Sequence, residues 1–280
     1  MNNADVQDDR HALLETIEAA GALAMEYFRR QDAGDLKAQK KPDGSLYSDA
    51  DIAVNELLRQ RLRAHAPDYG WLSEEDEYGT GRLEKRRVWI VDPIDGSRAF
   101  LRGDKEFAIC VCLIEDGEPI LAAIYVPALN ESYFACRGQG AWCNGTRLPV
   151  RAPMPSTSLS DCSLMTTGRV RRIDFWRELL GLEGDAQESR LPGSIAYRLL
   201  LVARGDFDAT LSMTQKWEWD LAAAHLIASE SGVKVTAREG STLCYNASVD
   251  GSCDGVLAAP AGLHERLAER IREGLARETS

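Results

Sequence analysis

Two apolar segments separated by only two residues place a tight turn in the middle of the chain. FAICVCLIE, residues 107–115, and EPILAAIYV, residues 118–126, are joined by Asp116 and Gly117. An Asp-Gly pair between apolar runs is a strong β-hairpin signal, because both residues tolerate the positive φ angles that the turn needs. The apolar segments SYFAC and AWC follow, and the second ends at Asn144-Gly145. The sequence therefore predicts an antiparallel meander in the first half of the chain.

Two helices are expected before this meander. Apolar residues recur at helical spacing near the start of the chain, at Leu13, Ile17, Ala20, Ala24 and Phe28. A second helix is expected to start at Ser48-Asp49-Ala50-Asp51, and WLSEEDE, residues 71–77, is interpreted as a charged loop. Residues 1–150 are therefore expected to form an α+β half.

The pattern changes near residue 150, where strands and helices begin to alternate. Strands are predicted at 159–167, 207–212, 233–237 and 255–260. Helices are predicted at 174–182, 194–205, 220–231 and 262–277. Such alternation is typical of α/β architecture, so residues 151–280 are expected to form an α/β half.

Composition excludes several classes of protein. The formal net charge of −11 argues against a partner such as a nucleic acid polymer or a membrane surface, since either needs a basic face. No apolar run approaches the roughly 20 residues of a membrane helix, and the N-terminus lacks a secretory signal pattern. The seven cysteines are scattered without metal-binding spacing, which is consistent with a reducing cytoplasm.

The segment VWIVDPIDGS, residues 88–97, carries two carboxylates at the end of a predicted buried strand. Asp, Pro and Gly are ordinary turn residues, so a simple turn is one interpretation. The other is a metal site, because two carboxylates held this close repel each other unless a cation or proton lies between them. Three more acidic sites stand at the edges of predicted elements, and each has an ordinary role at a helix end or in a solvated loop: Asp51, Glu74-Glu75 and Asp220.

These acidic sites occur in an order that resembles the inositol monophosphatase superfamily. LSEED at 72–76 precedes WIVDPIDGS at 89–97, and Trp219-Asp220 opens an alanine-rich helix. The resemblance extends from Lys41 to Tyr245-Asn246. It implies a layered αβαβα sandwich with the active site where the two halves meet. It also implies a lithium-sensitive, Mg²⁺-dependent phosphomonoesterase that acts on a small phosphorylated substrate, and either a homodimer or a monomer.

The resemblance also implies a role for individual residues. The ligands of two or three Mg²⁺ ions would be Glu74, Asp92, the Ile94 carbonyl, Asp95 and Asp220. Glu75 and Ser97 would orient the attacking water, with Asp51 behind them. The phosphate and the rest of the substrate would contact Gly96, Ser97, Gly193, Ser194, Ala196 and Lys41.

The resemblance leaves three substrates open. An acceptor glutamate for a polyol is missing at Ser212-Met213, which weakens the case for inositol phosphate. LSEED, EWD and AAAH are more similar to the 3′(2′),5′-bisphosphate nucleotidase branch, where Lys216 could hold a second phosphate. By contrast, GSIAYRLLLVARG resembles the inositol monophosphatase version of this helix, and SRAF at 97–100 resembles the histidinol-phosphatase branch. Adenosine 3′,5′-bisphosphate is favoured by a small margin.

Other interpretations are weaker. A phosphatase with an aspartate nucleophile in a DxD motif near the chain start does not match the DxxD spacing found here. A regulatory role through protein partners would be added to catalysis, since every metal ligand is present. Core packing is the favoured role of Trp217, Trp219 and His225. The alternatives are a base pocket lined by Trp217 or Trp219 and a contact from His225 to Asp220.

Overall fold

The turn at Asp116-Gly117 forms as predicted. The computed structural model describes residues 3–31, 38–40, 46–77, 79–155, 158–166, 178, 180 and 191–278. Strands β5 (Ala108–Glu115) and β6 (Glu118–Val126) pair antiparallel, and both turn residues have positive φ, 51° at Asp116 and 83° at Gly117. These angles match the turn type that joins twisted strands without splaying them.

The hairpin lies at the centre of a seven-stranded sheet. The meander continues into three further antiparallel strands, β7 (Glu131–Cys136), β8 (Gly140–Cys143) and β9 (Thr146–Arg147). On the other side of β5 lies β4 (Arg87–Asp95), which pairs in parallel with the edge strand β3 (Gly70–Ser73). The interpretation of WLSEEDE as a loop is wrong for its first part. A four-residue strand with a parallel partner carries too little local pattern to identify.

A smaller sheet of four strands lies in the second half of the chain. Its order is β10-β11-β15-β13, and only β10 and β11 are parallel. The strands are β10 (Leu164–Thr166), β11 (Ala209–Ser212), β13 (Val233–Thr236) and β15 (Val256–Pro260). The strand predicted at 159–167 is shorter than expected, because a 3₁₀ turn, Leu159–Asp161, occupies its start.

Most helices occupy positions that the periodicity predicts, and the short helix at Ser97–Leu101 is an additional one. They are α1 (Asn3–Gln31), α2 (Asp49–His65), α3 (Ser97–Leu101), α6 (Ile195–Arg204), α7 (Glu218–Glu230) and α8 (Leu263–Glu278). A 3₁₀ helix spans Thr80–Glu84, and two short ribbons pair β1 (Gln39–Lys40) with β2 (Leu46–Tyr47) and β12 (Lys216–Trp217) with β14 (Ser252–Cys253). The helix expected at 174–182 falls largely outside the described residues. Among these residues, no helix is long and apolar enough to cross a membrane.

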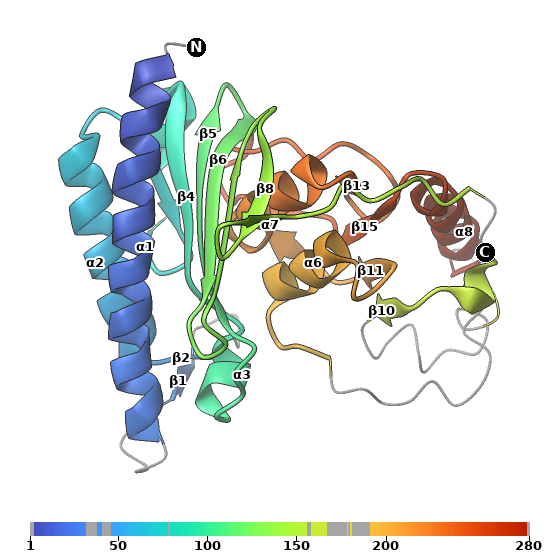
Figure 1. Ribbon diagram of the computed structural model, residues 1–280, viewed down its shortest axis with the longest axis horizontal. Coiled ribbons are helices and arrows are strands. Elements are labelled where there is room, and N and C mark those ends of the chain that lie inside the picture. The colour runs from blue at the N-terminus through green and yellow to red at the C-terminus, as the bar shows by residue number, and fades with distance from the viewer. Residues whose placement is uncertain are drawn as a thin grey trace.

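The elements stack in five layers. Helices α1 and α2 cover one face of the large sheet, and α6 and α7 cover the other (Figure 1). The small sheet packs on the far side of α6 and α7, and α8 closes the stack. The expected αβαβα sandwich is confirmed, while the boundary near residue 150 remains a prediction.

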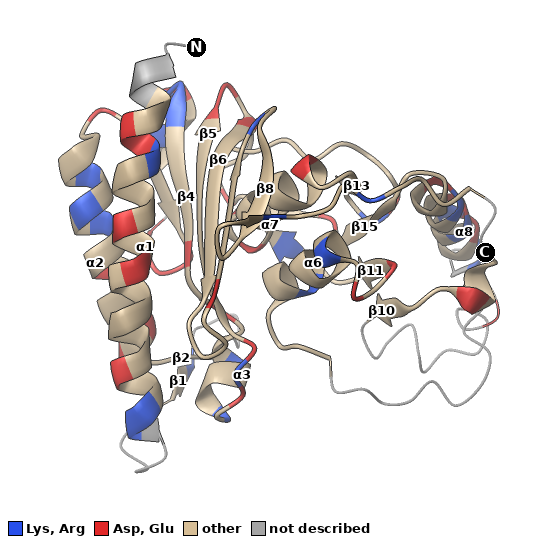
Figure 2. Ribbon diagram, viewed as in Figure 1, with Lys and Arg blue, Asp and Glu red and all other residues tan. Residues whose placement is uncertain are grey.

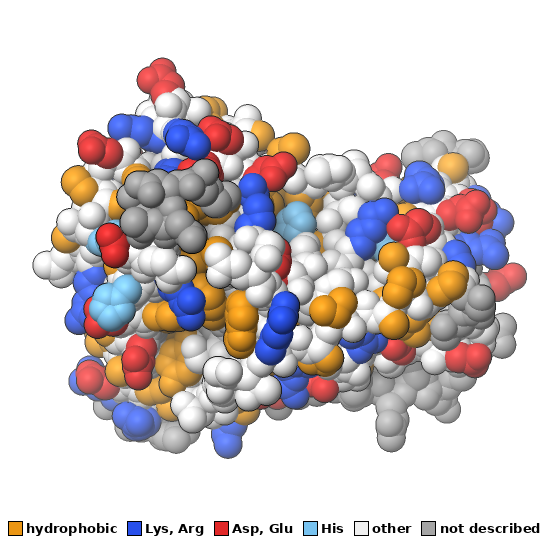
Figure 3. Space-filling view, turned by 45° about the horizontal axis from the view of Figure 1, so that its top comes forward, with side chains coloured by type: hydrophobic (Ala, Val, Ile, Leu, Met, Phe, Trp, Pro, Cys, Tyr) orange, Lys and Arg blue, Asp and Glu red, His pale blue; other side chains and the backbone are white. Residues whose placement is uncertain are grey.

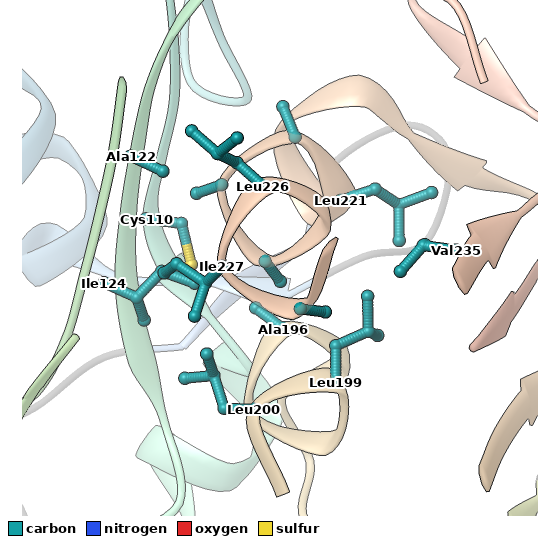
Figure 4. Close-up of a cluster of buried hydrophobic side chains, with 14 of the residues drawn as sticks. Cys110, Ala122, Ile124, Ala196, Leu199, Leu200, Leu221, Leu226, Ile227 and Val235 are labelled. Atoms are coloured by element: carbon teal, nitrogen blue, oxygen red, sulfur yellow. The ribbon is translucent and has the colours of Figure 1, made fainter. Parts of the chain in front are cut away.

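Most positions of helix α7 are buried and apolar, since a sheet packs on each side of it. In Figure 4, Leu226 and Ile227 lie on the side of Cys110, Ala122 and Ile124 of the large sheet. Leu221 lies on the opposite side of the helix, near Val235 of the small sheet. A helix without a polar face is stable only when it is buried in this way. The central position of α7 fixes the direction of its first turn, which carries Asp220.

Charged residues gather on the outer elements. Both acidic and basic residues lie along α1 and α2, and the middles of the strands carry few charges (Figure 2). On the face drawn in Figure 3, outside the grey atoms, Lys and Arg side chains are dispersed among acidic and apolar ones. This face does not present a continuous basic stripe.

Candidate active site

An irregularity in strand β4 brings Asp92 and Asp95 to one side of the sheet. Side chains of a regular strand alternate between faces, so two residues three positions apart would point in opposite directions. Between Asp92 and Asp95 the register with β5 shifts, and three steps along β4 match only two along β5, from Cys110 to Ala108. The extra residue is a β-bulge, and Pro93 fits there because it has no N–H to pair.

Asp220 joins these two carboxylates from the first turn of α7. One carboxylate oxygen from each of the three aspartates lies within 4.8 Å of the others. Asp92 is 1% exposed and Asp95 is 5% exposed, whereas Asp220 is partly buried. The DPID motif and the Trp219-Asp220 pair therefore meet in the fold, and the metal-binding role predicted for them remains a prediction.

The electrostatics of this cluster are unfavourable for three ionised carboxylates. Burial raises the pKa of Asp92 well above its usual value, and the nearby carboxylates of Glu74 and Asp95 raise it further. Burial also raises the pKa values of Asp95 and Asp220. Either protons or cations must therefore compensate the negative charge at neutral pH.

The donor set fits hard cations such as Mg²⁺. Asp92 Oδ1 accepts a hydrogen bond from the Ile94 amide at 3.0 Å, but Oδ2 is buried without a partner among the described residues. A buried carboxylate oxygen without a donor is costly unless a ligand completes it. All the candidate ligand atoms are oxygens, which Mg²⁺ prefers.

Asp95 is held rigidly by the N-terminus of α6. Its Oδ2 accepts hydrogen bonds from Ser194 Oγ at 2.5 Å and from the Ala196 amide at 2.7 Å. Ser194 also caps α6, because its Oγ accepts the Tyr197 amide. Gly96 approaches this turn so closely that a Cβ atom would lie 3.0 Å from the Ser194 nitrogen. Both Ser194 and Ala196, expected to face the substrate, thus contact Asp95.

Gly193 is also placed by close packing. A Cβ atom at this position would lie 2.6 Å from the Cβ of Ala99 in α3. Glycine is therefore needed for the chain to pass α3, and the substrate role predicted for it remains a prediction.

Ser97 and Asp51 form a second chain of contacts behind the cluster. Ser97 Oγ lies 3.0 Å from both Asp51 Oδ1 and the Ile94 carbonyl. Asp51 is buried at the third position of α2, and its Oδ2 accepts two hydrogen bonds from Ser48, from the amide and the hydroxyl, each at 2.8 Å. Asp51 therefore caps the start of α2 and also lies behind Ser97, the position predicted for it. Burial raises the pKa of Asp51.

Glu74 and Glu75 follow the C-terminal end of β3. The Glu74 amide donates to the Val91 carbonyl at 3.3 Å, which places Glu74 beside the residue before Asp92. Glu75 lies in the wall of a cavity of about 680 Å³ with Trp71 and Arg82, and none of the three clustered aspartates lines it. Lys41 lies outside the described residues.

The aromatic and histidine residues near α7 serve packing. Trp217 and Trp219 are stacked with ring centroids 6.0 Å apart, and Trp219 is buried. His225 Nδ1 lies 2.8 Å from the Tyr245 hydroxyl, and burial lowers the pKa of His225 to about 4. The packing interpretation is confirmed for Trp219 and His225.

Sequence reasoning missed Arg198, on α6. Its Nε donates to the Pro192 carbonyl at 2.7 Å, and the charge of Asp95 is close enough to raise its pKa, although burial lowers that pKa overall. Among the described residues, no carboxylate forms an ion pair with it. An arginine one turn after Ser194, inside the otherwise apolar run IAYRLLLVA, was the signal in the sequence.

Comparisons with known proteins agree with this geometry. The family model of the inositol monophosphatase family matches residues 5–276. A 3′(2′),5′-bisphosphate nucleotidase CysQ from Salmonella typhimurium is 34% identical over 230 residues, covering 80% of this chain and 85% of the relative. An inositol-1-monophosphatase from Rhizobium meliloti is 35% identical over 245 residues, covering 82% of this chain and 87% of the relative.

A third relative and two solved structures extend the likeness. A histidinol-phosphatase from Mycobacterium tuberculosis is 34% identical and covers 95% of this chain and 99% of its own. The extragenic suppressor protein suhB from Bartonella henselae has a TM-score of 0.77 at 26% identity, covering 94% and 98% of the two chains. An IMPase from Thermotoga maritima has a TM-score of 0.75 at 25% identity, covering 99% of each. The chain belongs to the inositol monophosphatase family and is a phosphatase.

Proposed function

We propose that the protein is a Mg²⁺-dependent phosphomonoesterase whose metal ligands are Glu74, Asp92, Asp95, Asp220 and the Ile94 carbonyl. The observation that carries this proposal is the cluster of three aspartates, with a buried Asp92 oxygen that has no donor among the described residues. When bound, Mg²⁺ would lower the pKa of a water molecule and neutralise charge on the phosphoryl group.

The protein's own residues would then orient the reactants. The Ser97 hydroxyl, which is held by Asp51, and the Glu75 carboxylate would orient the attacking water. Each would accept a hydrogen bond from one O–H group of that water. The amides of Gly96 and Ser97 would contact the phosphate. Ser194 and Ala196 would keep Asp95 in place during turnover.

The substrate we favour carries two anionic groups, as adenosine 3′,5′-bisphosphate does. Arg198 lies near Asp95 without a paired carboxylate among the described residues, and we infer that its terminal N–H groups would bind a second phosphate. Lys216 lies close enough to lower the pKa values of Asp95 and Asp220. Two cations near the aspartate cluster would suit a substrate that carries a second phosphate.

Inositol 1-phosphate is the second candidate, favoured by the identity to the Rhizobium meliloti relative. At the position where an acceptor for the polyol is expected, Ser212 is buried on β11 and Met213 follows it. The Ser212 hydroxyl lies 3.2 Å from Thr214 Oγ1, so it is already engaged. Histidinol phosphate remains an alternative through the Mycobacterium tuberculosis relative. A cytoplasmic location is also proposed, since all seven cysteines are free thiols.

The substitution Arg198→Leu tests the substrate assignment. We expect kcat/KM for adenosine 3′,5′-bisphosphate to fall about tenfold to a hundredfold, which is typical for a lost charge-assisted hydrogen bond, and kcat/KM for adenosine 3′-phosphate to change little. Arg204→Leu is the matched control, since Arg204 ends the same helix but pairs with Glu131 and Tyr133. Equal losses on both substrates would reject the second-phosphate role of Arg198.

A further inference from the structure

Arg82 connects two parts of the chain that are far apart in sequence. It belongs to the 3₁₀ helix that follows the Glu74-Glu75 segment, and its guanidinium reaches the loop at 246–249. One terminal nitrogen donates to Asn246 Oδ1, and the other donates to the carbonyls of Ser248 at 2.8 Å and Val249 at 2.9 Å. In return, the side-chain amide of Asn246 donates a hydrogen bond to the Arg82 carbonyl at 3.0 Å.

Asn246 passes this connection on to the start of α7. Its backbone amide donates to Glu218 Oε2 at 2.7 Å, and Glu218 is the first residue of the helix. Glu218 is 1% exposed, and its own amide donates to the Gly251 carbonyl at 2.7 Å. The first turn of α7 is therefore fixed by the 246–251 loop through both the backbone and a buried side chain.

Asp220 lies in that same turn. Its Oδ2 accepts the Trp217 amide at 2.9 Å, which ties the carboxylate to the residue just before Glu218. A shift of Glu218 would therefore move Asp220 relative to Asp92 and Asp95. Such a shift changes the spacing of the oxygens around a cation, to which Mg²⁺ is sensitive because it demands near-ideal octahedral geometry.

We propose that Arg82, Asn246 and Glu218, called the clasp below, are positioning residues that set the place of Asp220 relative to the segment carrying Glu74. The inference rests on the proposed function, in which Asp220 and Glu74 bind metal. It adds a device that joins the two ligand-bearing segments from outside the cluster of aspartates.

The burial of Arg82 supports a role beyond stability. The residue is 4% exposed, and its Nε has no partner among the described residues. A buried arginine with an unsatisfied donor is a weak stabilising element, since a well-packed apolar side chain often serves as well or better. Its fork of donors, by contrast, fixes the loop in one orientation.

The test compares Arg82→Met with Arg87→Met. Arg87 is a matched control because it is also a largely buried arginine with several partners. It donates hydrogen bonds to Glu115, Asp9 and Tyr69. It lies five residues before Asp92, about 16 Å away along the strand at about 3.3 Å per residue. The Kd for Mg²⁺ is measured by isothermal titration calorimetry on the full chain, and phosphate release is measured against Mg²⁺ concentration.

Loss of the clasp should weaken Mg²⁺ binding about tenfold or more, the usual effect of removing a residue that orients a ligand. Turnover by Arg82→Met should recover at high Mg²⁺, whereas Arg87→Met should keep the wild-type Kd even if its melting temperature falls. An unchanged Kd in folded Arg82→Met would overturn the inference. Wild-type protein that does not bind Mg²⁺ would reject the proposed function and, with it, the clasp.

A second variant guards against misfolding of the first. Asn246 has a φ of 53°, so Asn246→Gly removes the side chain without introducing strain and keeps the amide that reaches Glu218. We expect it to weaken Mg²⁺ binding in the same direction. In the double variant Arg82→Met/Asn246→Gly, the fold-increase in the Kd for Mg²⁺ should be smaller than the product of the two single fold-increases, because both substitutions remove the same contact. Fully multiplicative effects would contradict a shared clasp.

Discussion

At the scale of single residues, the surroundings of the Asp92 side chain are unfavourable for stability. It lies among carboxylates, burial raises its pKa, and one of its oxygens has no donor among the described residues. Functional sites commonly carry such a cost, because the groups are arranged for a ligand that is not part of the fold.

This cost predicts the behaviour of Asp92→Asn. The amide can keep the acceptor for the Ile94 N–H while removing a buried charge. The metal-free variant should therefore melt at the same temperature as wild type or higher, by about 2–4 °C if the gain is near 1 kcal/mol. Metal-dependent phosphate release should be lost. Both are measured by thermal unfolding in EDTA and by phosphate release in Mg²⁺.

Asp9→Asn provides the contrast. Asp9 is also buried, but its carboxylate is paired with His65, Tyr69 and Arg87. Its replacement should lower the melting temperature without a loss of metal response. If Asp92→Asn destabilised the metal-free protein as much as Asp9→Asn does, the cluster would be a structural network rather than a strained site.

Functional residues that belong to recognisable short motifs were predictable from the sequence, and isolated functional residues were not. Asp92, Asp95 and Asp220 belong to short patterns whose order carries information. Arg198 is a single charge in an apolar helix, and it becomes significant only because the N-terminus of α6 contacts Asp95. Its neighbours in space are distant in sequence, so no local pattern could reveal the contact.

At the scale of elements, the junction between β4 and α3 determines how the site is built. The bulge turns Asp95 to the side of Asp92, and Gly96 then turns the chain into α3 with a φ of 90°. Glycine is required there twice over, by the positive φ and by the approach of the Ser194 backbone.

Gly96→Ala should therefore affect activity more than stability. The left-handed backbone costs about 1–2 kcal/mol, and the added Cβ would push on the turn that holds Asp95. Gly138→Ala is the control, because Gly138 has a φ of 73° with nothing within 4 Å of an added Cβ. Both variants should lose free energy of unfolding, measured in urea, with the larger loss in Gly96→Ala, but only Gly96→Ala should lose most of its phosphatase activity. Equal activities would remove Gly96 from the site.

Elements with strong periodicity were predicted well. The hairpin, α1, α2, α6 and α8 follow from turn residues and apolar spacing. Strand β3 and the bulge in β4 were not predicted, because a short parallel strand and a register shift depend on partners that lie elsewhere in the fold.

At the scale of the whole molecule, two sheets share one helical layer, and the site lies at the ends of elements from both halves. The layered architecture was expected from the family resemblance, and the alternation of helices and strands by itself predicted only an α/β second half. The mostly apolar sequence of α7 indicated that the helix is buried. It did not indicate that the helix packs between two sheets.

Global stability should also depend on pH through His264, which is 1% exposed and packed far from the cluster on α8. Its Nε2 lies 2.9 Å from Thr236 Oγ1, and burial lowers its pKa to about 4. Because the unfolded chain takes up this proton at a pKa near 6.5, stability is constant above that pH and is lost as the pH falls toward 4.

The expected loss from this residue is about 1–2 kcal/mol between pH 7 and pH 5. It is measured as the difference in urea unfolding between wild type and His264→Gln at the two pH values. Gln does not titrate, so the variant should lose less stability on acidification. The same loss in both proteins would show that His264 is not held in its neutral form by the fold.

The most direct test of the account is phosphate release from adenosine 3′,5′-bisphosphate, inositol 1-phosphate and histidinol phosphate, run in parallel. Each substrate is assayed with Mg²⁺, with EDTA, and with Mg²⁺ plus lithium. We predict release that requires Mg²⁺, falls in EDTA and lithium, and is fastest on the bisphosphate. Release that is unaffected by EDTA, or no release from any of the three by folded protein with Mg²⁺, would contradict the proposal that the three aspartates form the metal centre of a phosphomonoesterase.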